Sequence, residues 1–336
     1  MSVAAKISEK ILTNAYKLQA TDIHFYPYTK QTDIYFRIHG VRTMYKTITA
    51  SQYRILLAYY KFASGMDIGQ IRNPQNGKIT HYTSSGRYDL RLSTLPVHQM
   101  ESLAIRILPK EDYYALEHLF LFPKQLQQLK ECISNKAGIF LMTGPTGSGK
   151  TTTMYALLEA LLAEKSYQMI TLEDPIEKNM NHILQVQVNE KAGVTYQAGL
   201  KAALRHDPDV LMIGEIRDKE IAKFAFEAAL TGHLVLSTLH AKNAIGTIYR
   251  LVEMGIKYSE IQQTLIAIAA LELIPIHYKG AFQRRAAIME LLTENTIEKV
   301  LNKGVKNVQP DYQTFRDLRK KAYAYGYTLE NQCDIP

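Results

Sequence analysis

The chain has 336 residues, of which 46% are hydrophobic and 21% charged, and this composition is typical of a globular protein with room for two domains. Its longest apolar tract, residues 265–276, is too short to span a bilayer, and the first ten residues lack the apolar core of a signal peptide. The two cysteines, Cys132 and Cys333, lie far apart and indicate neither a disulfide framework nor a zinc site, so we expect a cytoplasmic protein.

The net charge of +8 is concentrated in the N-terminal third of the chain. Residues 1–110 carry 15 lysines and arginines against 6 acidic residues, whereas residues 111–336 carry 25 against 26. The excess is compatible with nucleic-acid binding, with a surface for anionic lipid or an acidic partner, with arginines that serve a nucleotide, and with a solvated basic face without a special role. Charge alone leaves these four interpretations open.

Residues 1–109 predict a small, basic α+β domain. Apolar residues at helical spacing between Ile7 and Leu18 predict an opening helix. A second helix is expected over 51–64, and it ends at Gly65. Strands are expected over 22–26, 33–39, 41–46, 77–82, 87–94 and 102–108. The charged stretch after Pro109 predicts a linker over 110–122.

Residues 123–336 predict a second domain in which helices and strands alternate. Helices are expected over 123–134, 150–163, 194–205, 219–230 and 244–253, and strands over 138–143, 168–172, 209–213 and 233–238. This alternation predicts a mostly parallel sheet with helices on both faces. After it, we expect a buried helix over 264–271, two strands around a turn over 273–277 and 286–292, and short charged helices over 296–303 and 312–323.

A complete phosphate-loop motif lies between the first of these strands and its following helix. Its glycines let backbone N–H groups point at phosphate oxygens, on the positive end of the helix. Lys150 can reach the β- and γ-phosphates, and the Thr151 hydroxyl can ligate Mg²⁺. The strand before the motif and the helix after it argue against a chance glycine-rich turn. The predicted nucleotide-binding residues are Gly144, Pro145, Thr146, Gly147, Ser148, Gly149, Lys150, Thr151 and Thr152.

Two later segments place carboxylates directly after predicted strands. Glu173, Asp174 and Glu177 follow one strand, where they could hold Mg²⁺ through water or orient an attacking water. Gly214 and Glu215 follow the next strand, where the acid would face the γ-phosphate and the metal. The alternatives are an acidic capping loop and a strand that ends in one charged residue at a turn. The predicted metal ligands are Thr151, Glu173, Asp174 and Glu215.

Two histidines flank the fourth predicted strand of this domain. His233 precedes the strand and His240 follows it, so the two side chains are expected at opposite strand ends. His240, at the carboxyl end, is better placed to interact with the γ-phosphate. The alternative for a single histidine is a hydrogen-bonded packing residue, and it applies above all to His233. Both residues are candidate catalytic residues.

Taken together and in this order, the four segments resemble the nucleotide motifs of the type II secretion and type IV pilus ATPases. Gly-Pro-Thr-Gly-Ser-Gly-Lys-Thr is similar to their Walker A motif, Leu-Glu-Asp-Pro-Ile-Glu to their Asp box, Gly-Glu-Ile-Arg-Asp to their Walker B motif, and Thr-Gly-His with Ser-Thr-Leu-His to their His box. Ala20-Thr-Asp-Ile-His24 and Arg91-Leu-Ser-Thr-Leu-Pro, with Glu101 and Arg106, resemble their N-terminal segments. The resemblance covers roughly residues 20–292.

The resemblance implies a hexameric motor that hydrolyses ATP with Mg²⁺. It implies a RecA-like P-loop ATPase domain with a parallel-rich sheet, preceded by a smaller, PAS-like α+β domain. In this family two N-terminal arginines reach the nucleotide phosphates, and the matching positions are Arg91 and Arg106. The family's candidate for activating water matches Glu177. The catalytic set implied by the motifs is therefore Lys150, Glu177, Glu215, Arg91, Arg106, His240 and His233.

Departures from the family pattern indicate a subfamily. The sequence shows neither the four-cysteine zinc loop nor the extra N-terminal domain of secretion-type members, and Ala270-Leu-Glu-Leu replaces the usual Ala-Gln-Arg-Leu. In these respects it most resembles the competence-pilus assembly ATPases of Gram-positive bacteria. That resemblance implies a cytoplasmic motor, peripherally associated with the inner face of the membrane through a polytopic platform protein. It would drive pilins into a pilus or pseudopilus for DNA uptake, without sequence-specific binding of nucleic acid.

Three alternatives stay open at this point. A retraction motor that dismantles pili would carry the same motifs. A nucleic-acid translocase or binding module would use the basic N-terminal third, where Arg37, Arg42 and Arg54 occur among many tyrosines but form no clear cluster. A nucleotide-gated scaffold would bind ATP without significant turnover, and the presence of every carboxylate of the catalytic set argues against it.

Overall fold

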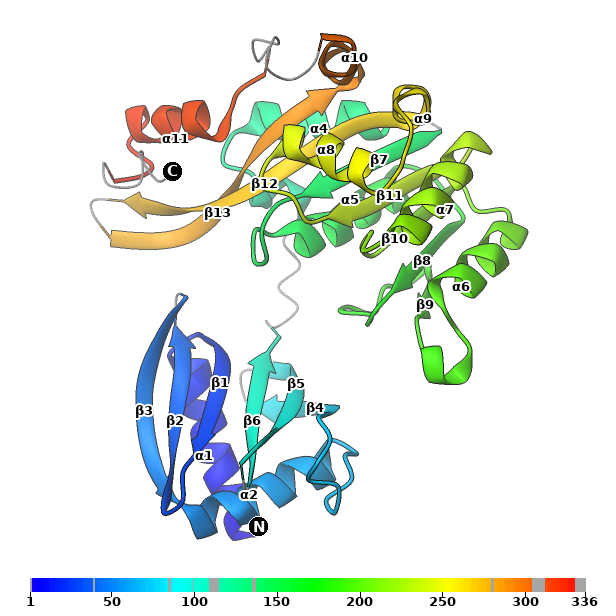
Figure 1. Ribbon diagram of the computed structural model, residues 1–336. Coiled ribbons are helices and arrows are strands. Elements are labelled where there is room, and N and C mark those ends of the chain that lie inside the picture. The colour runs from blue at the N-terminus through cyan, green and yellow to red at the C-terminus, as the bar shows by residue number, and fades with distance from the viewer. Residues whose placement is uncertain are drawn as a thin grey trace. The chain divides into compact units, whose positions relative to one another are not determined.

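The computed structural model describes residues 2–38, 40–83, 86–98, 100–108, 115–134, 137–278, 281–303 and 312–329. The chain forms two compact units, unit 1 over Met1–Asp112 and unit 2 over Tyr113–Pro336 (Figure 1). Helix α3 (Leu116–Leu119) lies within the segment predicted to be a linker, and its Leu116 is buried in a core of unit 2. The domain limits predicted from the sequence, 109 and 123, stay predictions.

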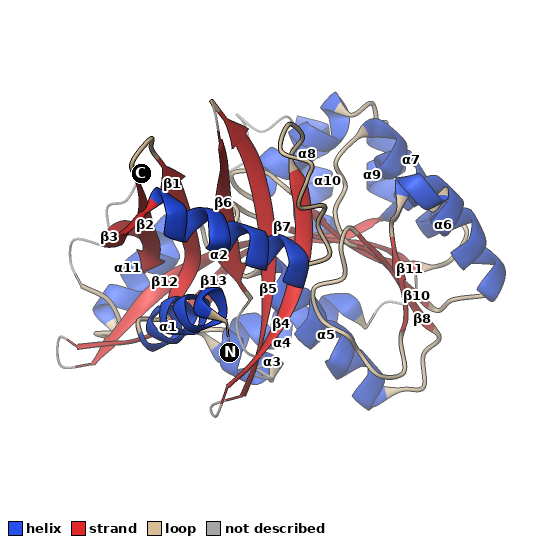
Figure 2. Ribbon diagram, turned by 90° about the horizontal axis from the view of Figure 1, so that it is seen from below, coloured by secondary structure: helices blue, strands red, loops and turns tan. Residues whose placement is uncertain are grey.

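Unit 1 is a six-stranded antiparallel sheet with two helices on one face. Its strands lie in the order β3-β2-β1-β6-β5-β4. Figure 2 shows both helices lying across the sheet. The elements are α1 (Val3–Lys17), β1 (Ala20–Pro27), β2 (Gln31–Ile38), β3 (Val41–Thr49), α2 (Ala50–Ala63), β4 (Gln75–Thr83), β5 (Gly86–Val97) and β6 (Met100–Ile107). This arrangement confirms the predicted strands and helices of the first third, with longer strands than expected.

Apolar and polar residues alternate along the strands, and this alternation decides which face of the sheet is buried. Ile23 and Phe25 on β1 point to the helix side, where they pack with Leu12 of α1 and with Tyr53 of α2 in one apolar cluster. Asp22 and His24, which alternate with them along β1, point to the opposite face. Both helices of the described part of unit 1 lie on the apolar side, so the polar positions form the other face of the sheet.

Unit 2 is built on a seven-stranded sheet in the order β13-β12-β7-β11-β10-β8-β9. Every neighbouring pair is parallel except β12 and β13, which are antiparallel. The strands are β7 (Gly138–Thr143), β8 (Met169–Glu173), β9 (Leu184–Gln187), β10 (Val210–Ile213), β11 (Leu234–Leu239), β12 (Leu265–Tyr278) and β13 (Ala281–Thr293). The mostly parallel sheet confirms the predicted fold class, although β9 was not among the predicted strands.

Helices cover both faces of this sheet. One apolar cluster contains residues of α6 (Tyr196–Ala203), α7 (Lys219–Leu230), α8 (Ala244–Glu253), α9 (Tyr258–Thr264) and α10 (Glu294–Lys303). The other contains residues of α3, α4 (Pro123–Ile133) and α5 (Lys150–Glu164). Ile139 and Leu141 of β7 belong to the first cluster and Phe140 and Met142 to the second, because successive side chains of a strand point to opposite faces. Helix α11 (Phe315–Ala324) packs in a smaller cluster with β12 and β13.

The prediction of a buried helix over 264–271 is wrong. Thr264 ends α9, and residues 265–271 form the first half of β12, which pairs in parallel with β7 and antiparallel with β13. A continuous apolar run with both faces buried has no period that distinguishes a strand from a helix, and the two strand partners satisfy its backbone. Strands β12 and β13 form the predicted pair around a turn, and residues 279 and 280 of that turn lie outside the described residues.

The parallel register brings several strand ends to one edge of the sheet. Leu239 at the end of β11 lies beside Thr143 at the end of β7, and Ile213 at the end of β10 lies between Ser237 and Leu172. Segments that follow these strands therefore start at the same carboxyl edge, where parallel sheets bind ligands. None of the described helices is both long and apolar enough to span a bilayer.

Candidate nucleotide site

The phosphate loop connects β7 to α5 at the carboxyl edge of the sheet. Gly144 has a φ of 139°, and a Cβ atom there would lie 2.6 Å from the carbonyl oxygen of Leu271. Gly149, with a φ of 92°, precedes the first residue of α5 and supplies no side-chain cap. The first N–H groups of a helix have no intrahelical partner, so the start of α5 offers donors and a positive dipole to an anion.

Lys150 lies folded inside this loop. Its Nζ donates to the carbonyl oxygens of Gly144, at 2.8 Å, and of Pro145, at 2.9 Å, and the residue is only 8% exposed. Burial lowers the pKa of the Lys150 ammonium, and the nearby charge of Glu215 opposes this effect. A phosphate group at this place would give the buried ammonium a counter-charge.

A second polar group of the loop fits the same ligand. The Ser148 hydroxyl is buried and, among the described residues, has no hydrogen-bond partner. A buried hydroxyl without a partner is costly, so a phosphate oxygen is a natural acceptor for it. The other predicted loop residues, Pro145, Thr146, Gly147 and Thr152, are exposed, and Thr151 is half-buried at the start of α5. These residues fit a nucleotide polyphosphate.

Glu215 and His240 come together beside the loop. Gly214, at the end of β10, accepts a hydrogen bond from the Thr238 hydroxyl at 2.7 Å, which ties this strand end to β11. Glu215 follows it and is half-buried, and its carboxylate lies 3.3 Å from Nε2 of His240. The two strand ends lie side by side, so the register of the sheet brings the predicted acid and the predicted histidine into contact.

Arg217, which was not among the predicted site residues, bridges two of the predicted carboxylates. Its Nη1 lies 2.7 Å from Oδ2 of Asp174, and its Nε lies 3.4 Å from Oε2 of Glu215. These ion pairs are half exposed, so they contribute little to stability but keep both carboxylates at the same edge. The only sequence signal for Arg217 is its position two residues after Glu215.

Glu173 lies in a different environment from Asp174. It is buried and accepts hydrogen bonds from the hydroxyl of Tyr155, from the hydroxyl of Thr171 at 2.6 Å and from Nε2 of Gln185 at 3.1 Å. Protein donors therefore engage both of its oxygens. The sequence offered no signal for Tyr155, which lies on α5 and reaches Glu173 only through packing.

The predicted metal ligands do not form a compact group in this chain. Among the described residues, no three histidine, cysteine or acidic side chains are arranged to hold a metal ion. Thr151 lies at the start of α5, Glu173 is held by protein donors, and Asp174 and Glu215 share Arg217. Thr151 is itself a residue of the phosphate loop, and Glu215 is the member whose strand end lies beside that loop.

His233 lies at the opposite edge of the sheet from Glu215. It precedes β11, and its carbonyl oxygen accepts a hydrogen bond from the N–H of Gly138, the first residue of β7. Its Nδ1 lies 3.0 Å from the carbonyl oxygen of Ala228 and 3.0 Å from the hydroxyl of Thr231. Within one copy of the chain His233 therefore binds the end of α7, and the structure does not bring it to His240.

Arg91 and Arg106 lie side by side in unit 1. They are direct cross-strand partners on β5 and β6, so both side chains point to the same face of the sheet. Nε of Arg106 donates to Oδ1 of Asp22 at 2.9 Å, and Nε of Arg37 lies 3.9 Å from the other oxygen. The same cross-strand row runs over all six strands through Lys78, Arg91, Arg106, Asp22, Arg37 and Arg42.

This row places much of the N-terminal charge on the sheet face opposite the helices. Asp22 is its one acidic member, and its carboxylate is largely buried among the arginines. The sequence alone could not reveal the row, because its members are separated by up to 84 positions and only the strand register aligns them.

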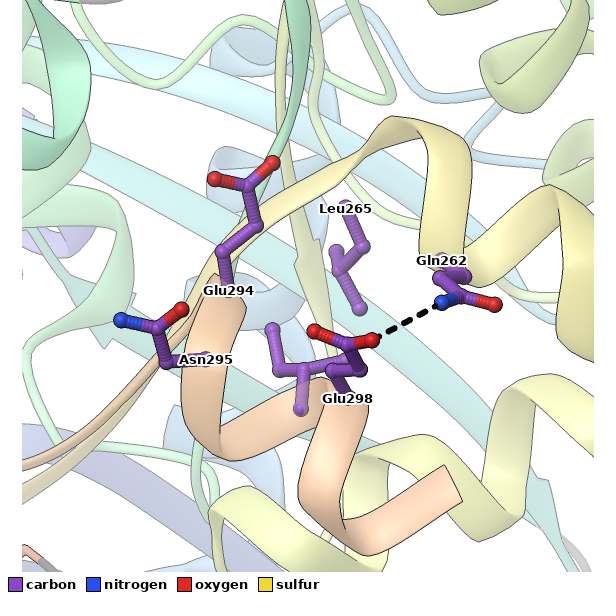
Figure 3. A pocket seen from close by; sticks show the side chains of 6 residues that line it. Gln262, Leu265, Glu294, Asn295 and Glu298 are labelled. Atoms are coloured by element: carbon purple, nitrogen blue, oxygen red, sulfur yellow. Dashed lines mark hydrogen bonds between the residues drawn. The ribbon is translucent and has the colours of Figure 1, made fainter. Parts of the chain in front are cut away.

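Unit 2 contains a hollow away from the phosphate loop. Figure 3 shows Gln262 and Glu298 facing each other across it, and Nε2 of Gln262 lies 3.4 Å from Oε1 of Glu298. The lining comes from α9, the first residue of β12 and α10: Gln262, Leu265, Glu294, Asn295, Ile297 and Glu298. This hollow lies at the amino end of β12, and its two carboxylates give it the wrong charge for a phosphate.

Comparison with known proteins decides the family. The family model described as "Type II/IV secretion system protein" matches residues 1–329. The chain belongs to the type II/IV secretion system protein family. This membership confirms the resemblance inferred from the four nucleotide motifs.

Three similar proteins place the chain within this family. Competence protein ComGA of Bacillus subtilis strain 168 is 42% identical over 348 residues, which covers 99% of this chain and 98% of ComGA. Type IV pilus assembly ATPase PilB of Thermus thermophilus is 40% identical over 319 residues, which covers 94% of this chain but only 33% of PilB. The crystal structure of the pilus retraction motor PilT with bound ADP has a TM-score of 0.73 and 29% identity, and covers 99% of this chain and 96% of that one.

Proposed function

We propose that this protein is a hexameric motor ATPase that hydrolyses ATP to drive assembly of a competence pilus or pseudopilus for DNA uptake. The observation that carries the proposal is the loop with Lys150 inside it, next to the paired Glu215 and His240 at neighbouring strand ends. The identity to ComGA over nearly the full length of both chains supports the competence pathway. The relative PilB is an assembly ATPase and the relative PilT is a retraction motor, and the higher identity to PilB favours assembly.

In this proposal the loop holds the polyphosphate of ATP. The N–H groups at the start of α5 and the Ser148 hydroxyl bind phosphate oxygens, and Lys150 turns from the loop carbonyls to the β- and γ-phosphates. Thr151 and Glu215 would hold Mg²⁺ directly or through water, and the bound ion would neutralise charge on the transferred phosphoryl group. His240 orients the Glu215 carboxylate, and Glu177 activates the attacking water.

Arg91 and Arg106 would close on the phosphates from unit 1, as the resemblance of their segments to the family motifs implies. Their position as neighbours on one sheet face lets both guanidinium groups meet one polyanion. Phosphoryl transfer needs mainly positioning and neutralisation of charge, so closing and opening of this contact would couple hydrolysis to domain movement. We further propose that the motor works in the cytoplasm at the inner face of the membrane, bound to a polytopic platform protein.

The ATPase assignment is tested by Lys150→Ala. We expect steady-state phosphate release by the purified variant to fall to background, because the ammonium is the main side-chain charge on the β- and γ-phosphates. Lys165→Ala, at the exposed C-terminal end of the same helix, is the matched control and should keep its turnover. Turnover of Lys150→Ala within a factor of about two of wild type would contradict the assignment.

The nucleic-acid alternative is tested on the arginine pair. Arg91→Ala and Arg106→Ala should each lower turnover roughly 10- to 1000-fold, as for loss of a transition-state donor, and leave affinity for double-stranded DNA unchanged. A nucleic-acid module predicts near-normal turnover and a DNA affinity that falls, with a shallower salt dependence. Arg54→Ala, which changes an exposed arginine on α2, controls for the loss of charge.

The proposed hexamer is tested by light scattering with ATP and Mg²⁺. A strict monomer at every concentration would refute the hexameric ring.

A further inference from the structure

The segment that carries Glu177 has no regular secondary structure of its own. Strand β8 ends at Glu173, β9 begins at Leu184, and the ten residues between them form turns and bends. The Glu177 side chain is exposed. A water-activating carboxylate must be held within a fraction of an ångström, so something other than a helix or strand has to fix this segment.

The geometry points to Tyr155 as the residue that positions Glu177, and this inference rests on the proposed function. The Tyr155 hydroxyl accepts a hydrogen bond from the backbone N–H of Glu177 at 3.1 Å and another from that of Lys178 at 3.3 Å. It donates its own proton to the buried carboxylate of Glu173. Tyr155 is 5% exposed, so water does not readily replace these bonds. One phenol oxygen therefore ties the Glu177 backbone to the end of β8.

Two further contacts hold the same segment. Gln185 on β9 donates from Nε2 to the carbonyl oxygen of Lys178 at 2.8 Å, and its Oε1 accepts from the N–H of Met180. The Lys178 ammonium lies 2.7 Å from the carboxylate of Glu159, which is on α5. The backbone on the C-terminal side of Glu177 is thus fixed by α5 and by β9.

These contacts connect Glu177 to the phosphate loop through a single helix. Lys150 and Tyr155 lie on α5, five residues apart, which is about 7.5 Å along the helix axis. A helix of this length is stiff, so the phosphate loop and the Glu177 anchor move together. Tyr155 is a positioning residue in this scheme: it touches the backbone of Glu177 and not the substrate.

Tyr155→Phe tests the inference, because it keeps the ring and removes only the hydroxyl. We expect kcat for ATP hydrolysis to fall about 10- to 100-fold, the scale of an ångström-sized misplacement, while the Kd for ATP stays within about threefold. Tyr60→Phe is the matched control. It removes a buried hydroxyl that bonds to Ser8 in unit 1, and it should leave kcat unchanged.

A double-mutant cycle with Glu177→Gln separates a positioning role from general damage. If Tyr155 acts through Glu177, Tyr155→Phe should slow the Glu177→Gln protein by less than about twofold. If it slows that protein as much as wild type, Tyr155 acts elsewhere and the inference is overturned, while the proposed function stands. A Glu177→Gln protein with wild-type turnover would instead refute the role proposed for Glu177.

A second variant covers the case in which Tyr155→Phe fails to fold. Gln185→Met preserves the side-chain length at a half-buried position but removes the bonds to Lys178, Met180 and Glu173. It should lower kcat in the wild-type background and have little effect in the Glu177→Gln background. An equal fall in both backgrounds would show that the contacts anchoring this segment do not act through Glu177, and it would overturn the inference.

Discussion

Gly144 is the position where the phosphate loop tolerates a side chain least. Its φ of 139° lies in a region that residues with a Cβ seldom adopt, which costs about 1–3 kcal/mol. An added Cβ would also lie 2.6 Å from the Leu271 carbonyl oxygen and 2.7 Å from Oγ of Ser148. Leu271 lies within β12, where it pairs with Met289 of β13, so its carbonyl oxygen has little freedom to move, and overpacking adds about 1–3 kcal/mol.

We therefore expect Gly144→Ala to destabilise unit 2 by roughly 4 kcal/mol, which for about two hundred residues corresponds to a fall in Tm of ~8–16 °C. Gly147→Ala is the matched control in the same loop. Gly147 also has a positive φ, of 81°, but among the described residues no atom lies within 4 Å of its added Cβ. Its cost should be about 1 kcal/mol and ~2–4 °C.

The assay is thermal unfolding of both variants without nucleotide, followed by circular dichroism. Measuring the free protein separates strain in the loop from any effect on ATP binding. If the two variants melt within about 2 °C of each other, the close approach of the loop to β12 does not add to the destabilisation of Gly144→Ala, and this explanation is refuted.

Three further predictions follow from single contacts. Glu215→Gln should bind ATP with near-normal affinity in a titration yet hydrolyse it at least ~100-fold more slowly, and a parallel loss of affinity would contradict the division of roles. Asp22→Asn should destabilise unit 1 by about 1 kcal/mol in thermal unfolding, because it removes the carboxylate that holds Arg106 and Arg37. The control Asp89→Asn, whose partner Arg87 is exposed, should destabilise unit 1 by less in the same assay. Burial, together with the charge of Glu272, raises the pKa of Glu290, so the folded protein binds the carboxyl proton of Glu290 more tightly than the unfolded chain does. The contribution of Glu290 to stability therefore falls as the pH rises through this raised pKa. The Tm of Glu290→Gln relative to wild type should therefore increase between about pH 4 and pH 8, and a difference that does not change with pH would exclude this explanation.

The phosphate loop and the alternation of elements could be predicted from the sequence because both are local. Gly144 to Thr151 are consecutive residues, and their conformational needs are visible as glycines followed by a helix. The carboxyl edge of a parallel sheet then follows from topology, so the sequence predicts Glu215 and His240 at that edge, and in the structure the two side chains lie 3.3 Å apart. The separation of His233 from His240 by one strand was also expected from their spacing.

Tertiary structure decided the features that depend on partners far away in the chain. The run from Leu265 is a strand because β7 and β13 lie on either side of it, and nothing within the run itself distinguishes it from a buried helix. Glu173 resembles its neighbour Asp174 in sequence, yet only Glu173 is buried and bound by Tyr155 and Gln185. Hydrogen bonds of this kind depend on register and packing between segments that the sequence does not place side by side, whereas a turn or a helix start is determined by the residues that form it.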